Sequence, residues 1–143
     1  MRVGSKGRYA VKAIIFLAQQ DQRIPMSLSE VASLHEISLS YLEQIFAKLR
    51  VAGIVKSIRG PGGGYILSKS AEKIQISEII SAVEMPTRKS EIDKSETGVL
   101  WNALGDQVLG FLNSISVADV CECRIESAWT AKQTSSLSYA LSR

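Results

Sequence analysis

The chain has 143 residues, of which 45% are hydrophobic and 22% are charged, a balance that supports a buried core and argues against a wholly disordered chain. No apolar run approaches the ~18 residues needed to cross a bilayer, and the first residues show no secretory signal, so a cytoplasmic protein without a membrane partner is expected. Residues 1–73 hold 11 Lys and Arg against 5 Asp and Glu, whereas residues 74–143 hold 6 against 9. The basic first half indicates contact with a polyanion, with solubilising surface lysines as the alternative.

Three helices are predicted in the first 53 residues. Residues 8–20 are apolar nearly all round, as expected of a largely buried helix. A capping box, Ser27-Leu-Ser-Glu30, opens a short second helix. Its inward positions are expected to be Leu28, Val31, Ala32 and Leu34. Ser38 is a suitable N-cap for a third helix over 39–52, and Gly53 is a natural end. The apolar stripe of this third helix is Leu39, Leu42, Ile45, Phe46 and Leu49.

A glycine-rich turn, Arg59-Gly-Pro-Gly-Gly-Gly-Tyr65, lies between the β-prone residues 54–59 and 65–67. The order helix, helix, helix, strand, turn, strand is typical of a winged helix-turn-helix. Nucleotide-binding loops are excluded by register, because no Lys-Ser or Lys-Thr follows the glycines as Walker A requires and the dinucleotide spacing fails as well. The expected fold is therefore mostly α with a small β-wing.

The second helix of such a motif lies in the major groove of DNA, so the polar face of helix 39–52 is the candidate reading surface, with a solvated polar face as the alternative. Gln can pair with adenine, Ser with either partner, and Glu with cytosine. Because phosphates repel a carboxylate, Glu43 is expected to select against wrong sites. Arg59 can reach a phosphate or enter a narrow minor groove. The predicted DNA-binding set is Ser38, Ser40, Tyr41, Glu43, Gln44, Lys48, Arg59, Gly60, Pro61, Gly62, Gly63 and Gly64.

The second half of the chain is expected to form further helices around a polar loop. A helix over 76–84 closes the first domain, 1–84, and the polar loop follows at 85–98. A long helix from Val99 to about Asn113 and a short helix started by Ser116-Val-Ala-Asp119 make a second unit, 99–126. Residues 127–143 show no strong periodicity and are expected to be a fraying tail.

Three motifs resemble a known family: Ser5-Lys-Gly-Arg-Tyr-Ala-Val11, Ile37-Ser-Leu-Ser-Tyr-Leu-Glu-Gln44 and the glycine-rich turn. Together with Ile80-Ser-Ala-Val83 and the long helix, they resemble the Rrf-type transcriptional regulators, closest to the iron–sulfur cluster regulator (IscR-like) kind, from residue 1 to about 120. The resemblance implies a homodimer that binds double-stranded DNA at a pseudo-palindromic operator. It matches Ser40, Glu43, Gln44, Arg59 and the glycine tip to DNA contacts. It also implies dimerisation through Leu100, Trp101, Leu104, Val108, Phe111 and Leu112.

The sequence departs from the cluster-binding members of that family. Those members carry three cysteines, and often a histidine, between the wing domain and the dimer helix. Residues 84–99 of this chain contain Glu91, Asp93 and Glu96 but no Cys or His, and His35, the single histidine, is expected to be a surface or packing residue. Because iron–sulfur clusters are held mainly by thiolates, no cluster and no other cofactor is expected.

Cys121 and Cys123 leave one alternative open. Duplicated across a dimer, the pair could offer four thiolates to a metal or act as a redox sensor, although positions i and i+2 of a helix point about 200° apart. No nucleophile elbow or other catalytic set is present, so an enzyme is not expected. The other alternative is a winged-helix protein-interaction module that regulates a partner protein. The sequence selects neither an operator nor an effector, small molecule or protein.

Overall fold

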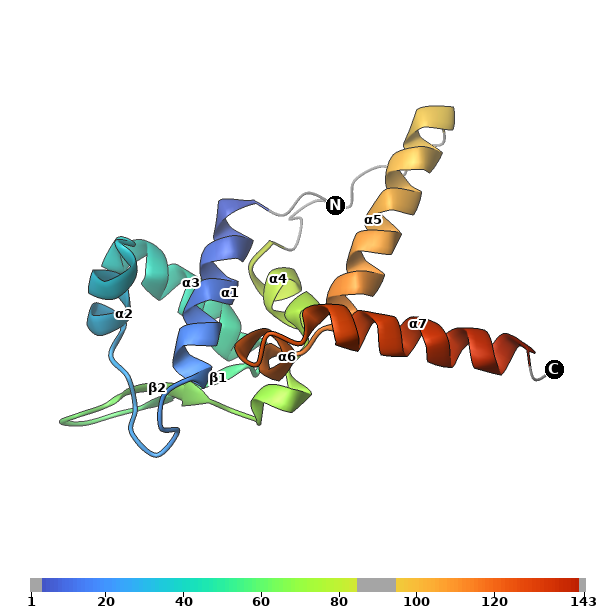
Figure 1. Ribbon diagram of the computed structural model, residues 1–143. Coiled ribbons are helices and arrows are strands. Elements are labelled where there is room, and N and C mark those ends of the chain that lie inside the picture. Colours follow the sequence, from blue (N-terminus) through green and yellow to red (C-terminus); the bar gives the residue numbers. More distant parts are fainter. Residues whose placement is uncertain (1–3, 85–94, 142–143) are drawn as a thin grey trace.

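The computed structural model describes residues 4–84 and 95–141, and it is a mostly helical fold with one small antiparallel sheet (Figure 1). The elements are α1 (Ser5–Ala18), α2 (Leu28–His35), α3 (Leu39–Val51), β1 (Val55–Ile58), β2 (Gly64–Leu67), η1 (Ala71–Lys73), α4 (Ile76–Glu84), α5 (Glu96–Ser114), α6 (Val117–Cys121) and α7 (Ile125–Leu141). The predicted fold class is confirmed. None of the described helices is long and apolar enough to cross a membrane.

The helix starts follow the capping residues that the sequence indicates. Ser27 and Glu30 form the predicted capping box at α2, each side chain accepting a hydrogen bond from the other residue's backbone N–H. The Ser38 hydroxyl accepts the N–H of Tyr41 at 3.1 Å and so caps α3. These local bonds satisfy backbone donors that a helix N-terminus leaves unpaired, which fixes where each helix begins.

The core is built where α1, α3 and α4 meet. Helix α1 contributes Ala10, Ala13, Ile14 and Leu17, and the small alanines let the neighbouring helices approach closely. Helix α3 buries Leu42, Ile45, Phe46 and Leu49, which are all the residues of its predicted stripe except Leu39. Helix α4 buries Ile76, Ile79, Ile80 and Val83. Each large apolar side chain buried here stabilises the fold by roughly 1.5–3 kcal/mol.

Three details of the predicted burial are wrong. Leu34 is 63% exposed and Leu39 is 40% exposed, because they lie at the facing ends of α2 and α3, beyond the packed part of each helix. Helix α1 is not buried all round: Val11, Ile15 and Phe16 are only half-buried. The described residues therefore leave one side of α1 partly exposed.

The expected tail at 127–143 is also wrong, since α7 covers Ile125–Leu141. Trp129 packs edge-on against Phe111 of α5, with ring centroids 5.1 Å apart, and the rest of α7 projects from the body (Figure 1). Periodicity missed this helix because its apolar residues form no stripe. Helix α5 begins at Glu96, before the predicted start at Val99, so the predicted polar loop 85–98 ends earlier than expected. Residues 85–94 of that loop lie outside the described residues.

A long-range hydrogen bond ties the end of α4 to the start of α1. The Gly7 N–H donates to the Glu84 carboxylate at 3.0 Å. A carboxylate is favoured at a helix N-terminus because the unpaired N–H groups carry partial positive charge. A Cβ on Gly7 would lie 2.9 Å from the Glu84 carboxyl carbon. Gly7 is therefore required by the close approach of Glu84.

Gly7→Ala and Glu84→Ala are expected to break the same contact. The methyl group that Gly7→Ala adds would displace the Glu84 carboxylate, and Glu84→Ala removes that carboxylate. Each is expected to lower the free energy of unfolding by about 1–2 kcal/mol, and the double variant by much less than the sum. Urea unfolding measures all three. Gly110→Ala is the control, because Gly110 lies in a helix with open space around it and should gain roughly 0.5–1 kcal/mol. Full additivity of Gly7→Ala and Glu84→Ala would contradict the shared contact.

Candidate nucleic-acid interface

A tight turn sets the angle between α2 and α3. Glu36 adopts a left-handed conformation with φ of +53°, and the Ile37 N–H donates to the Ala32 carbonyl at 3.1 Å. The buried Ile37 side chain fixes this turn to the core. The pair of helices thus has the arrangement of a helix-turn-helix, in which the second helix presents its outer face.

The outer face of α3 carries the side chains that the sequence predicts to read bases. Ser40, Glu43, Gln44 and Lys48 are all exposed, on the side opposite the buried stripe. They offer a hydroxyl, a carboxylate, an amide and a cation within the first three turns of the helix. This combination can donate to and accept from base edges.

Tyr41 has a different environment from its neighbours. Its ring is half-buried and packs edge-on against Tyr9 of α1, with centroids 5.9 Å apart. Tyr9 therefore supports the first turn of α3, a role that sequence reasoning missed because residues 8–20 looked like a uniformly buried helix. The polar hydroxyl of Tyr9 among apolar neighbours was the available signal.

The two strands of the wing pair in register from Val55↔Leu67 to Ile58↔Gly64. Met26, in the segment between α1 and α2, adds a short third partner by exchanging two backbone hydrogen bonds with Tyr65, at 3.0 and 2.8 Å. The Tyr65 ring also packs against Phe46 of α3, 5.0 Å between centroids. The base of the wing is therefore fixed to the inner side of the candidate reading helix.

The tip of the wing is a tight turn with defined glycine requirements. The Gly63 N–H donates to the Gly60 carbonyl at 2.9 Å, with Pro61 in the second position and Gly62 in the third at φ +71°, which is the type II pattern. A Cβ on Gly64 would overlap the backbone carbonyl of Met26. Internal geometry thus explains these glycines without any DNA contact.

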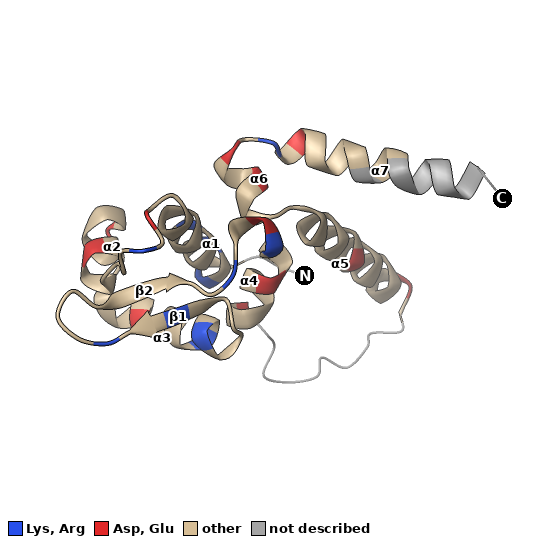
Figure 2. Cartoon of the chain, turned by 90° about the horizontal axis from the view of Figure 1, so that it is seen from below, with Lys and Arg blue, Asp and Glu red and all other residues tan. Residues whose placement is uncertain are grey.

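Positive side chains gather beside this face. Figure 2 shows Lys and Arg residues on α3, β1 and the wing loop. The exposed cations there are Lys48, Arg50, Lys56 and Arg59. Arg59 directly precedes the tip and forms no ion pair with a described residue. The sequence analysis did not single out Arg50 and Lys56, because a lone cation in the sequence carries no signal of where the fold will place it.

An exposed polar helix beside a basic β-hairpin defines a winged helix-turn-helix protein of the DNA-binding class. The Rrf2 family model, described as "Iron-dependent Transcriptional regulator", matches residues 3–123. The chain belongs to this family of transcriptional regulators, as the sequence motifs indicated.

Relatives and solved structures agree with that assignment. The chain is 43% identical to the HTH-type transcriptional regulator IscR of Escherichia coli K12, across 84% of this chain and 80% of that protein. The structure of T. potens IscR is similar with a TM-score of 0.73 and 38% identity, covering 85% of this chain and 87% of the other. CymR, the global cysteine regulator of B. subtilis, gives 0.73 and 34%, covering 85% and 97%. The printed names describe the E. coli protein as a transcriptional regulator and CymR as a global cysteine regulator.

The residues available here do not fit an iron–sulfur cluster. The sequence has no Cys between Glu84 and Val99, where the resemblance predicts cluster ligands, and Glu91 and Asp93 lie outside the described residues. Among the residues that the structure describes, no group of three or more His, Cys, Asp and Glu side chains could hold a metal ion. Carboxylates alone are poor substitutes for the thiolates that clusters require.

The two cysteines lie at the end of α6. Cys121 is its last residue, and burial, then the neighbouring Glu122 carboxylate, raises the pKa of its thiol. Cys123 is exposed in the following turn with φ of +56°, outside the helix. The helical geometry assumed for this pair in the sequence analysis is therefore wrong. A protonated thiol is a weak nucleophile and metal ligand, so the environment of Cys121 disfavours both roles.

Gly64→Ala is expected to force β2 away from Met26 and to lower the free energy of unfolding by about 1–3 kcal/mol, because the methyl group overlaps backbone atoms that cannot rotate away. Gly62→Asn is the matched control, since Asn is tolerated at the third position of a type II turn and nothing lies within 4 Å. Thermal unfolding of both variants measures the difference. Equal stability of the two would contradict the close approach of Gly64 to Met26.

Proposed function

We propose that this protein is a sequence-specific transcriptional regulator that binds a pseudo-palindromic operator as a homodimer and works without an iron–sulfur cluster. The observation that carries the proposal is the exposed polar face of α3, held rigidly beside the basic wing. Two copies related by a two-fold axis would place two such faces on successive major grooves, which is how dimeric helix-turn-helix proteins read palindromes.

The proposed roles within each half-site follow from side-chain chemistry. Gln44 and Ser40 read base edges, and Glu43 accepts from cytosine and repels wrongly placed phosphates. Ser38, whose hydroxyl is used by the helix cap, and Tyr41, held by Tyr9, orient the first turn of α3. Lys48, Arg59 and the backbone of residues 60–64 contact phosphates, because cations and N–H groups supply most phosphate contacts.

Exposed apolar residues on α5 support the homodimer. Leu100 is 58% exposed and Trp101 is 61% exposed, and Leu104 and Val99 beside them are also exposed. A patch of large apolar side chains on one helix marks an interaction site. Val108 is half-buried, whereas Phe111 and Leu112 pack within their own chain. The first half of α5 is therefore the part that a second copy would cover.

Arg59→Ala is expected to weaken binding to every DNA sequence and to reduce the slope of log K against log salt by about 0.9, because one phosphate contact is lost. Lys73→Ala, which removes an exposed cation from η1, the element that packs against α6, is the control and should leave the slope unchanged. Gel-shift titrations on the protein's own promoter at several salt concentrations measure both. No binding by the wild type would favour the protein-interaction alternative instead.

Gln44→Ala is expected to cost about 1–3 kcal/mol on the cognate operator and little on random DNA, because the amide reads one base pair. Competition titrations with single-base operator variants locate that base pair. An equal loss on cognate and random DNA would show that Gln44 acts as a general contact and would overturn its reading role.

Anaerobic reconstitution with iron and sulfide is expected to yield no stoichiometric visible absorbance band, because the usual thiolates are absent from the sequence. The same reaction on a Cys121→Ser, Cys123→Ser double variant shows whether any absorbance that develops depends on these two cysteines. A stoichiometric band in the wild type that the double variant lacks would refute the cluster-free proposal and assign the cluster to these two cysteines.

A further inference from the structure

The outer face of α3 changes character along its length. At about 100° per residue, four residues fall within about 60° of one another and form the centre line of this face: Ser40, Gln44, Ala47 and Val51. All four are exposed, Val51 by 87%. The first two carry a hydroxyl and an amide, whereas the last two carry only hydrocarbon. The centre of the candidate reading face is therefore polar in its first half and apolar in its second half.

Ala47 has the smallest side chain on this line. It lies about one turn beyond Gln44 and about one turn before Val51, so two longer side chains flank a recess in the face. Beside the line, Ala47 also borders a hollow of about 710 Å³ between α3 and α4, together with Lys48 and Val51. The Ala47 methyl group is therefore open to a partner in the described part of the chain.

The backbone that carries Ala47 is held firmly from the inner side of α3. Ile45, Phe46 and Leu49 are all 0% exposed, and the Phe46 ring packs against Tyr65 of the wing with 5.0 Å between centroids. The Cβ atom of an alanine has no rotamers, so its place is set by the backbone alone and no side-chain entropy is lost when it makes a contact. The Ala47 methyl group thus has a fixed position on the reading face.

One feature of the major groove matches an exposed methyl group. Thymine is the only base that presents a methyl group there, and an apolar side chain such as Ala recognises it by direct contact. A polar side chain at the same point would lose its water without gaining a hydrogen bond from that methyl group. The recess at Ala47 therefore has the size and the chemistry for the methyl group of a thymine.

We propose that Ala47 reads the C5-methyl group of one thymine in each half-site of the operator. This proposal rests on the DNA-binding role of α3 in the proposed function and adds a base to those read by Ser40, Glu43 and Gln44. Ala47 lies about 4.5 Å beyond Gln44 along α3, and successive base pairs are about 3.4 Å apart. The thymine is therefore one or two base pairs away from the base pair that Gln44 reads.

Operators that differ by one methyl group test the proposal on the full chain. Each thymine of the operator is replaced in turn by uracil, which keeps the base pair and removes only the methyl group. At the contacted thymine, the change is expected to weaken binding about fourfold in one half-site and about fifteenfold in both, because a buried methyl group is lost each time. Fluorescence anisotropy titrations measure the affinities.

A second pair of operators separates the methyl group from the rest of the base. Cytosine and 5-methylcytosine, each paired with guanine, are placed at the contacted position. The 5-methylcytosine operator is expected to bind about fourfold more tightly than the cytosine operator, because it returns the methyl group to the same place in the major groove. Equal affinity of these two operators would contradict a methyl contact.

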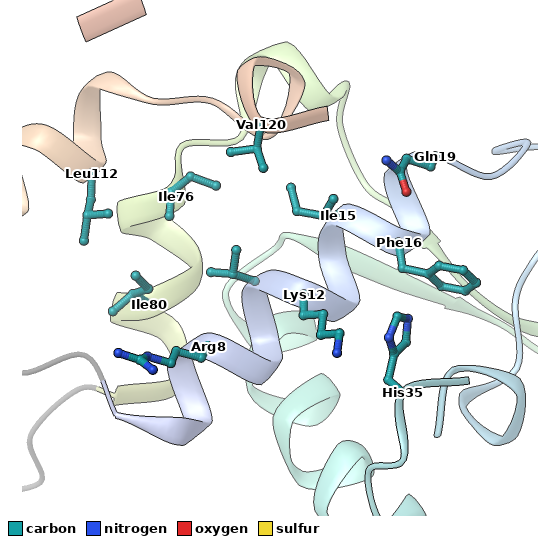
Figure 3. A pocket seen from close by; sticks show the side chains of 11 residues that line it. Arg8, Lys12, Ile15, Phe16, Gln19, His35, Ile76, Ile80, Leu112 and Val120 are labelled. Atoms are coloured by element: carbon teal, nitrogen blue, oxygen red, sulfur yellow. The ribbon is translucent and has the colours of Figure 1, made fainter. Parts of the chain in front are cut away.

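The variant Ala47→Gly removes the other side of the contact. It is expected to bring the ratio of affinities for the thymine and uracil operators close to one. Since one protein preparation is titrated with both operators, a loss of folding cancels from this ratio. Lys48→Ala, on the same helix, is expected to weaken binding to both operators by the same factor and to keep the wild-type ratio. Lys12→Ala should also keep the ratio, because Lys12 lies on α1 near Phe16 and His35 (Figure 3).

The failure of the thymine contact and the failure of the proposed function are distinguishable. A wild-type chain that does not bind its own promoter overturns both together. A wild-type chain that binds its operator but is indifferent to uracil at every thymine overturns the thymine contact alone, and Ala47 is then only a good helix former. A uracil effect that persists in Ala47→Gly assigns the methyl group to another residue and overturns the role of Ala47.

Discussion

The close packing of α1 against the other helices is the constraint on which the rest of the structure depends. Gly7, Ala10 and Ala13 present almost no side chain, so α4 and α3 can approach the α1 backbone, and Glu84 can accept the Gly7 N–H. A larger residue on that face would separate the helices and open voids, which close-packed interiors tolerate poorly. Every functional surface of the protein is positioned relative to this one helix.

The candidate DNA-binding face is held to α1 by one aromatic contact, and the wing is held by a short bridge and a second aromatic contact. Tyr9 of α1 supports Tyr41 in the first turn of α3, and Met26, in the segment after α1, pairs with Tyr65 of the wing. Phe46 and Tyr65 then fix the wing to α3. A reading helix and a wing whose relative position is set in advance lose less conformational entropy on binding, which favours discrimination between sequences.

The opposite side of α1 and the first half of α5 both expose apolar side chains that no described residue of the chain covers fully. The sequence has no cysteine between Glu84 and Val99.

The sequence by itself determined the local elements, because caps, turns and periodic stripes are set by neighbours in the chain. Ser27 with Glu30, Ser38, and the glycine turn after Arg59 place the helix-turn-helix and the wing, and the motif resemblance predicted the family. Only the tertiary structure decided which faces are covered. It left Leu34, Leu39 and one side of α1 open, it held Tyr41 with Tyr9, and it made α7 a helix through Trp129 and Phe111. The reason is physical: burial depends on contacts between residues far apart in the chain, and periodicity along one segment carries no information about which partner will cover it.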